Sequence, residues 1–161
     1  KKSSNIKIKK QNYDIKIFEN LLDGSENFAL IKGNLKKSKN PRVRVISSNI
    51  VKNYLMGEKL PNSFNKTIDY FKHHKDCVLI FIRDTNLKSV SETLRGYKNE
   101  KFGKKGQEKL IKNYGIGAQI IKALNIKKMI LVTRSRKKVV GLEGYGIKIT
   151  EQEIIKWKYV L

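Results

Sequence analysis

Hydrophobic positions along the chain follow two different spacings, which predicts a mixture of strands and helices. Residues 42–47 alternate polar and apolar side chains, as a half-buried strand does. Residues 77–82 are almost all apolar, which favours a strand covered on both faces. Residues 14–31 suggest two strands around the turn-forming segment 22–25, with a compact apolar run at 28–31.

Helical spacing appears twice with clear apolar faces. Phe64, Ile68 and Phe71 predict a short amphipathic helix over residues 64–72. A second helix is predicted by four apolar residues that share one helical face: Ile116, Ile120, Ile121 and Leu124. Asn125 follows them and suits the left-handed cap that ends such a helix. We also expect strands at 128–133 and 147–149, a weaker helix at 91–98 and a Lys- and Gly-rich loop at 98–107. Strand, helix and strand in this order form a βαβ unit, so the expected fold is α/β, a mixed sheet flanked by helices.

The length of 161 residues fits a single domain with a real core. The first ten residues are mostly Lys, Ser and Asn, so we expect a basic linker over residues 1–12 and one domain over 13–161. We find no signal-peptide pattern and no apolar run long enough to span a membrane, which favours a cytoplasmic protein. The single cysteine, Cys77, excludes an internal disulfide and a zinc site made of several cysteines.

The net charge of +22 would favour any polyanion as a partner. The basic residues are 30 Lys against 6 Arg, however, and Arg is the residue preferred for bidentate recognition of phosphates and bases. This bias is more typical of a solvated surface, so dedicated nucleic-acid binding is the less favoured interpretation of the charge.

Two blocks in the last third of the chain resemble GTP cyclohydrolase II of riboflavin biosynthesis. They are residues 114–120, Tyr-Gly-Ile-Gly-Ala-Gln-Ile, and residues 139–147, Val-Val-Gly-Leu-Glu-Gly-Tyr-Gly-Ile. Residues 23–33 and 42–45 are similar to the family's N-terminal hairpin and to its strand leading to the active site. The likeness spans residues 14–150, and two long blocks in register are far more specific than an isolated glycine motif.

The resemblance implies an enzyme that opens the imidazole ring of GTP and releases formate and pyrophosphate. Such chemistry calls for a metal-activated water, and the family holds zinc with three cysteines. It also needs an acid–base residue, an Arg at the phosphoryl centre and groups that bind a triphosphate.

The positions that carry this chemistry in the family hold other residue types here. The motif Arg-x-His-Ser-Glu-Cys falls on residues 44–49, where Arg44 and Ser47 match and the His, Glu and first zinc Cys become Ile46, Ser48 and Asn49. The other two zinc cysteines fall near Leu60 and Asn62, which are unsuitable zinc ligands. We therefore expect neither zinc nor another cofactor.

The nucleotide-recognition and catalytic positions are also changed. Of the family's nucleotide-recognition motif, which falls on residues 83–90, only Arg83 is kept. The catalytic Asp and Arg are replaced by Leu110 and Lys112, and a Leu side chain cannot move a proton. The phosphate-facing positions are better kept, since Thr133 and Lys138 match the family's Thr and Lys. The vestigial binding set is therefore Arg44, Ser47, Arg83, Thr133 and Lys138, which would hold GTP, another nucleotide or a phosphate anion, or else form an ordinary basic loop.

Three hypotheses follow, and whether the chain is an enzyme stays open among them. The first is a non-catalytic GTP cyclohydrolase II-like domain with a structural, dimerisation or regulatory role. The resemblance then implies a homodimer and a fused 3,4-dihydroxy-2-butanone 4-phosphate synthase domain upstream, which would carry the enzymatic activity of the parent protein. The second is an active nucleotide hydrolase with altered, metal-free chemistry, and the third is a basic module that binds nucleic acid or another anion.

Overall fold

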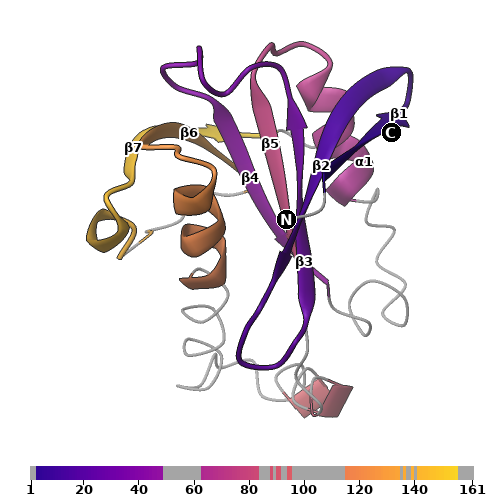
Figure 1. The fold of residues 1–161 in the computed structure, drawn as a ribbon, viewed down its shortest axis with the longest axis vertical. Coiled ribbons are helices and arrows are strands. Elements are labelled where there is room, and N and C mark those ends of the chain that lie inside the picture. Colours follow the sequence, from indigo (N-terminus) through magenta and orange to yellow (C-terminus); the bar gives the residue numbers. More distant parts are fainter. Residues whose placement is uncertain are drawn as a thin grey trace.

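The computed structural model describes residues 3–48, 63–83, 88, 90–91, 94–95, 115–134, 136, 139 and 141–155. These residues form one seven-stranded sheet in the order β1-β2-β3-β5-β4-β6-β7, with helical segments packed on its two faces (Figure 1). The predicted α/β fold with a mixed sheet is confirmed. The loop expected at 98–107 and most of the helix expected at 91–98 lie outside the described residues.

The first half of the sheet is an antiparallel meander. Strands β1 (Ser3–Ile8), β2 (Gln11–Glu19) and β3 (Glu26–Lys32) pair in sequence order, and β3 then pairs antiparallel with β5 (Cys77–Ile82). The hairpin predicted around residues 22–25 is confirmed.

The linker expected at residues 1–12 differs from the structure, because these residues contain β1 and the start of β2. Strand β1 is an edge strand whose side chains are mostly exposed, and its apolar alternation is limited to Ile6 and Ile8, which is too short to predict a strand. Its backbone still pairs with β2 over six residue pairs, from Ser3 opposite Lys16 to Ile8 opposite Gln11.

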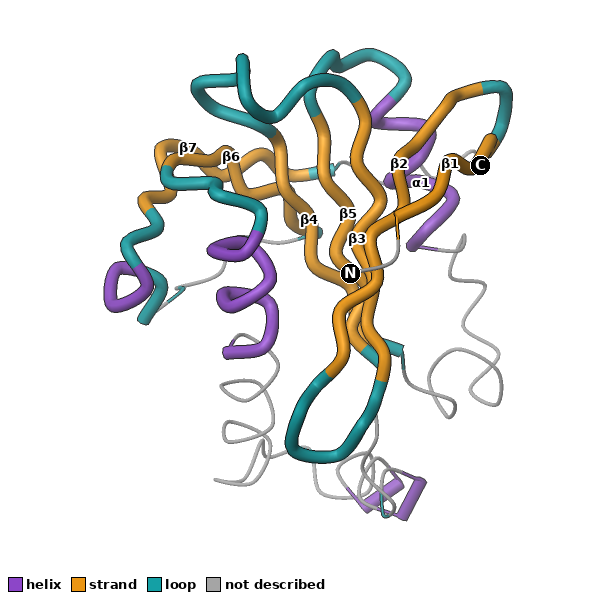
Figure 2. The backbone as a smooth tube through the Cα atoms, in the orientation of Figure 1, coloured by secondary structure: helices purple, strands orange, loops and turns teal. Residues whose placement is uncertain are grey.

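The second half of the sheet is parallel. Strand β4 (Arg42–Ser47) lies between β5 and β6 (Lys128–Thr133), and β6 pairs with the edge strand β7 (Lys148–Ile154). Helix α1 (Ser63–Phe71) connects β4 to β5, and the helical residues 115–123 precede β6. Figure 2 shows these two helices at well-separated positions beside the sheet.

Two apolar clusters hold the helices on opposite faces of the sheet. The helix at 115–123 packs on one face through Ala118, Ile121 and their neighbours, which contact Val43, Ile80 and Leu131. Helix α1 packs on the other face through Ile68 and Phe71, which contact Tyr13, Leu30 and Leu79. Both faces of β5 are therefore covered, as its apolar sequence predicts.

The ends of both helices are fixed by specific groups. Asn125 has φ 59°, which confirms the left-handed cap predicted after the helix at 115–123. The ammonium group of Lys32 donates to the carbonyl oxygens of Phe71 and His74, so a cation covers the carboxyl end of α1 where the helix dipole is negative.

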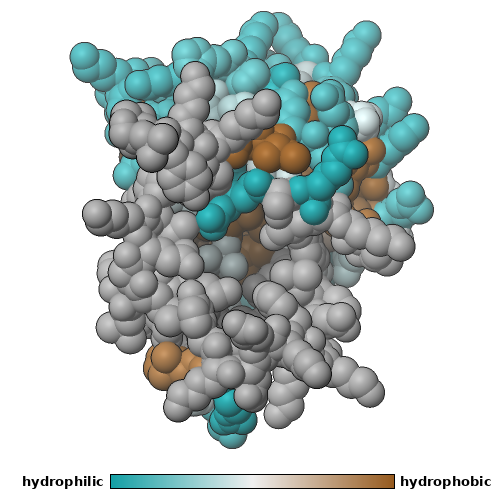
Figure 3. Space-filling view, turned by 180° about the vertical axis from the view of Figure 1, so that it is seen from behind, coloured by the Kyte–Doolittle hydropathy of each residue, from teal (hydrophilic) through white to brown (hydrophobic). Residues whose placement is uncertain are grey.

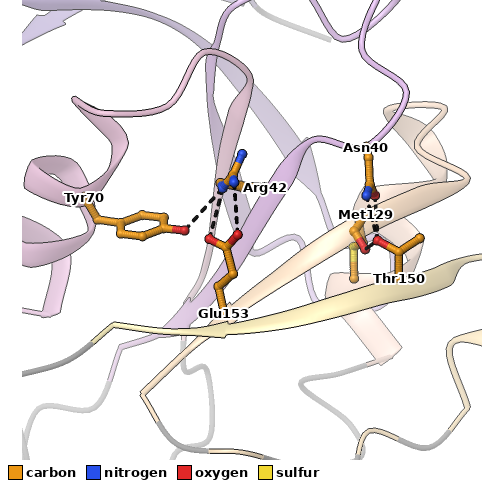
Figure 4. A network of polar contacts seen from close by, with 6 residues as sticks. All are labelled: Asn40, Arg42, Tyr70, Met129, Thr150 and Glu153. Atoms are coloured by element: carbon orange, nitrogen blue, oxygen red, sulfur yellow. Dashed lines mark hydrogen bonds and ion pairs between the residues drawn. The ribbon is translucent and has the colours of Figure 1, made fainter.

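Two polar contacts bind the edge strand β7 to the rest of the sheet (Figure 4). Arg42 donates to both carboxylate oxygens of Glu153 at 3.0 and 2.9 Å, and its Nε also lies 3.3 Å from the hydroxyl of Tyr70 on α1. Thr150 contacts the Asn40 side chain at 2.7 and 2.9 Å and donates to the Met129 carbonyl at 3.2 Å.

Candidate ligand crevice at the carboxyl ends of the parallel strands

The carboxyl ends of β4 and β6 form a topological switch point. The chain leaves β4 through α1 and returns to the sheet at β5, whereas it leaves β6 in the opposite direction and returns at β7. In open α/β sheets, ligands bind in the crevice outside strand ends that diverge in this way. The residues at these two strand ends are therefore the first candidates for a binding site.

Arg44 occupies the gap where β4 and β6 separate. The pairing of the two strands ends at Val43 and Leu131, and beyond it the Arg44 guanidinium donates to the Val132 carbonyl oxygen at 3.2 Å. The other terminal nitrogen of Arg44 donates to the Ser63 hydroxyl at 3.0 Å, at the first residue of α1. Arg44 thus bridges β6 and the amino end of α1.

The environment of Arg44 is electropositive. Its side chain is only 6% exposed, and within the described part of the chain its Nε is buried without a hydrogen-bond partner. Burial and the nearby charge of Arg134 lower the pKa of Arg44 to about 10. Desolvation and the same Arg134 lower the pKa of Lys66, which lies in the first turn of α1.

The amino end of α1 adds to this field. Helix amino ends favour anions because their first backbone N–H groups carry partial positive charge. The first turn of α1 contains no acidic residue. Arg44, Lys66, Arg134 and this helix end therefore make a setting that suits an anion, and we call them the cationic cluster.

Ser47 and Thr133 lie at the same sheet edge as Arg44 but on the other face. Ser47 is three residues beyond Arg44 on β4, so the two side chains point to opposite faces of the sheet. Val43 and Val45 share the face of Ser47, and they pack with the helix at 115–123. Thr133 ends β6 on the face shared with Met129 and Leu131. Among the described residues, the Thr133 hydroxyl is buried without a hydrogen-bond partner. The predicted set is thus divided between two faces of the sheet.

Arg83 follows β5 directly and is exposed. Its backbone N–H donates to the side-chain oxygen of Asn27 at 2.9 Å, and Asn27 is 3% exposed at the start of β3. Asn27 therefore fixes the path of the chain at the end of β5. Sequence reasoning missed this residue because a lone Asn next to a predicted strand gives no pattern. Lys138 lies outside the described residues.

Ile46, which the resemblance matches to a histidine, lies on β4 on the same face as Arg44. It is partly buried and packs against the apolar cluster under α1, which includes Ile68 and Leu79. A ring nitrogen at this position would face hydrocarbon, which disfavours a polar side chain here.

The residues expected at the family's metal and catalytic positions lie outside the described part of the chain: Asn49, Leu60, Asn62, Leu110 and Lys112. Their chemistry alone can be compared with zinc, and it does not fit, because Leu has no donor atom and the Asn amide is a poor zinc ligand. Across the residues that the structure does describe, no group of three or more His, Cys, Asp or Glu side chains could hold a metal ion. Cys77 is buried at the start of β5.

The family model for GTP cyclohydrolase II matches residues 1–153. The chain belongs to the GTP cyclohydrolase II family. Among curated proteins it is 27% identical over 156 residues to riboflavin biosynthesis protein RibBA of Aquifex aeolicus, a match that covers 89% of this chain and 38% of that protein. It is also 30% identical over 141 residues to monofunctional riboflavin biosynthesis protein RIBA 2, chloroplastic, of Arabidopsis thaliana, covering 83% of this chain and 29% of that protein.

A shorter segment is closer to a third relative, and a solved structure shares the fold. RibBA of Chlorobium phaeovibrioides is 52% identical over 54 residues, which are 34% of this chain and 12% of that protein. RibBX, a two-domain 3,4-dihydroxy-2-butanone 4-phosphate synthase from A. baumannii, superposes with a TM-score of 0.60 at 20% identity, covering 98% of this chain and 39% of that one. The chain thus spans less than two fifths of the length of each of these relatives.

Within the described residues, no helix is long and apolar enough to cross a membrane.

Proposed function

We propose that this GTP cyclohydrolase II-like domain no longer hydrolyses GTP and serves a structural or regulatory role in riboflavin biosynthesis. The observation that carries the proposal is the packing of Ile46 under α1, because the resemblance to the family matches this position to a histidine. A change that fills a reactive position with hydrocarbon supports loss of chemistry, because the site gains packing at the expense of proton transfer.

The donor set at the family's zinc positions supports the same proposal. A catalytic zinc needs three protein ligands and an open position for water. Asn49, Leu60 and Asn62 supply no thiolate, imidazole or carboxylate. When zinc is bound in the family, it activates the water that attacks the base, and the residues at these three positions are not suited to holding it.

The cationic cluster supports retention of an anion-binding role. Arg44 is held by the Val132 carbonyl and the Ser63 hydroxyl, so its guanidinium has a fixed position at the switch point. Arg134 and Lys66 bring two further charges to the same place. A nucleotide phosphate or pyrophosphate would offset this repulsion, and it would give the domain a ligand with which to regulate its neighbour.

The context of the domain is part of the proposal. The similarity to proteins of about two and a half times its length supports a fused 3,4-dihydroxy-2-butanone 4-phosphate synthase domain upstream, which would carry the enzymatic activity. We also propose that the protein is a homodimer and lies in the cytoplasm. In this arrangement the present domain contributes assembly and anion sensing.

The net charge of +22 is the observation that favours a second candidate, a module that binds nucleic acid. The described part of the rear face is largely hydrophilic, with hydrophobic side chains in small areas between (Figure 3). If anions bind only to the overall positive charge, their affinity falls steeply as the salt concentration rises. A specific phosphate site would instead distinguish one anion from another at constant ionic strength. A titration with a short oligonucleotide and with GTP at two salt concentrations separates the two.

Zinc binding tests the proposed loss of chemistry. The purified chain is incubated with excess zinc, dialysed and analysed by elemental mass spectrometry, beside a family member that has all three cysteines. We expect far less than one zinc per chain here and about one in the control. Stoichiometric zinc that survives dialysis would contradict the proposal.

A further inference from the structure

The tip of the β2–β3 hairpin presents two leucines to solvent. Leu21 is 92% exposed and Leu22 is 95% exposed, whereas the other exposed large hydrophobic residues of the described chain lie between 42% and 44%. Single exposed leucines are ordinary on protein surfaces, but an adjacent pair at the end of a projecting ribbon concentrates apolar area at one point.

The turn that carries these leucines is ordered by its own polar groups. The Asn20 N–H donates to the Ser25 carbonyl, the Gly24 N–H donates to the Asn20 carbonyl, and both distances are 2.8 Å. The side chains of Asn20 and Asp23 accept from the N–H groups of Leu22 and Ser25 at 3.0 and 2.9 Å. The leucines are therefore held outward by a defined loop conformation.

The hairpin extends beyond the sheet at the edge where the parallel strands end. Strand pairing between β3 and β5 begins at Phe28 opposite Phe81, so in the residues before Phe28 the strand ladder continues only with β2. The β2–β3 loop projects from the body of the sheet in Figure 1. Its tip is accessible to another molecule without any change in the fold.

The charge of the hairpin tip is opposite to that of the rest of the chain. Residues 17–31 are the longest stretch without Lys or Arg, and they contain Glu19, Asp23 and Glu26. These three acids contribute −3, so the remaining residues carry a net +25 against the chain's total of +22. Glu19 and Glu26 also face each other directly across the strand ladder, a like-charge pair that is unfavourable unless a cation lies nearby.

These features together identify the chemistry of the partner. An acidic tip repels nucleic acid and anionic lipid, and it attracts a strongly basic protein surface. Two copies with a net +22 each would repel one another unless a local acidic element opposed the repulsion. We propose that the hairpin tip docks on the basic surface of a second copy of this chain, with Leu21 and Leu22 as apolar anchors and Glu19 and Glu26 as charge partners.

This inference rests on the homodimer in the proposed function and names the element that forms it. In a two-fold arrangement each copy would extend its hairpin to the other, so that the same contact is made twice. A small number of well-buried side chains usually carries most of the binding free energy of an interface, so loss of two apolar contacts should be measurable.

The test is the mass of the intact chain in solution, measured by sedimentation equilibrium over a range of concentrations. We expect wild type to dimerise. In the double variant Leu21→Ser with Leu22→Ser, the dissociation constant of the dimer should rise by at least about 30-fold. Because both side chains are almost fully exposed, the variant should keep its fold and thermal midpoint. Ile154→Ser, at a residue that is 43% exposed on β7, is the matched control and should dimerise as wild type does.

A second variant tests the charge pairing. The double variant Glu19→Lys with Glu26→Lys keeps a like-charge pair in the same register, so its hairpin should be about as stable as that of wild type. The charge that the hairpin tip presents to a partner changes from negative to positive. We expect the dimer to be lost in this variant. A wild-type dimer that persists in both variants would overturn the hairpin proposal and leave the homodimer standing, and a monomeric wild type would overturn both. Either result would leave the proposed loss of GTP hydrolysis unaffected.

Discussion

Arg42 on β4 and Glu153 on β7 form a two-point ion pair that spans the intervening strand β6. The two nitrogen–oxygen distances are 3.0 and 2.9 Å, and both side chains are about three-quarters buried. The hydrogen bond with Glu153 is the main cause of the raised pKa of Arg42. The pair fixes an edge strand whose own residues are largely polar.

Glu153→Gln should destabilise the fold by about 1 kcal/mol, because it leaves a partly buried guanidinium facing a neutral amide. Glu151→Gln, two residues earlier on β7, is the matched control and should cost much less, since Glu151 is exposed. Denaturant unfolding of both variants provides the measurement. Equal losses of stability would show that the ion pair contributes nothing specific.

Gly33 ends β3 with φ +85°, and a side chain there would collide with the Asp76 carboxylate and the Lys75 carbonyl. Gly33→Ala should therefore destabilise by about 2–3 kcal/mol through backbone strain and steric displacement. Gly24, with φ +68° and open space on the side where a Cβ would lie, isolates the backbone contribution. Gly24→Ala should cost about 1 kcal/mol, and thermal unfolding of the two variants tests the difference.

Cys77 should make stability fall in alkaline solution. Burial raises the pKa of its thiol from an ordinary 9.0 to about 11. The folded state therefore keeps the proton that the unfolded chain releases, so this contribution is complete below pH 9 and is lost as pH rises from 9 to 11. The expected slope is about 1.4 kcal/mol per pH unit.

Cys77→Ala should remove this slope whatever it does to absolute stability. Unfolding free energies of wild type and variant are measured by denaturant titration across that pH range. Tyr13, whose pKa is raised to about 12 by burial and by the nearby Cys77, contributes a second decline that begins near its ordinary value of 10.0. The comparison is therefore sharpest between pH 9 and 10, below the start of this second decline. Parallel pH profiles for the two proteins would contradict the prediction.

The cationic cluster should be required for anion binding. Arg134→Met and Arg44→Met should each weaken pyrophosphate binding by about tenfold or more, because each removes a charge-assisted contact. Arg134 is exposed, so its substitution should leave the fold intact. Lys122→Met removes one exposed charge from the helix at 115–123 and controls for long-range attraction.

Isothermal titration at constant ionic strength measures all four proteins. Equal affinities would exclude the cluster as the binding site, and an equal loss in Lys122→Met would indicate a generic electrostatic effect.

Local pattern was sufficient to predict most of the elements. The alternation in residues 42–47 and the apolar run at 77–82 correspond to β4 and β5 with the expected bounds. The helix predicted at 64–72 is α1, shifted by one residue. These segments are clear because each buries an apolar face, and burial imposes the spacing that the sequence displays.

Other features could not be predicted because they depend on distant parts of the chain. Strand β1 is mostly polar and exposed, and it owes its structure to backbone pairing with β2. The Arg42–Glu153 pair joins residues 111 positions apart. The order of the strands, with β4 between β5 and β6, is set by the crossovers and has no local signature.

The candidate site shows the same division. The family motif predicts Arg44, Ser47 and Thr133 as site residues, but it does not show that Arg44 lies on the opposite face of the sheet from the other two. Nor did it identify Lys66 and Arg134 as the charges beside Arg44. A motif shows where along the chain a site residue is expected. Which side chains lie close together depends on the alternation of side chains along each strand and on the handedness of the crossovers.

Formate release from GTP is the most direct measurement of whether this domain has lost its chemistry. The purified chain is incubated with GTP and zinc, and formate is quantified beside a family member that keeps the three cysteines and the catalytic Asp and Arg. We expect no formate above the protein-free background, with GTP recovered intact. Formate produced over repeated turnovers, and abolished by a chelator, would contradict the proposed loss of GTP hydrolysis.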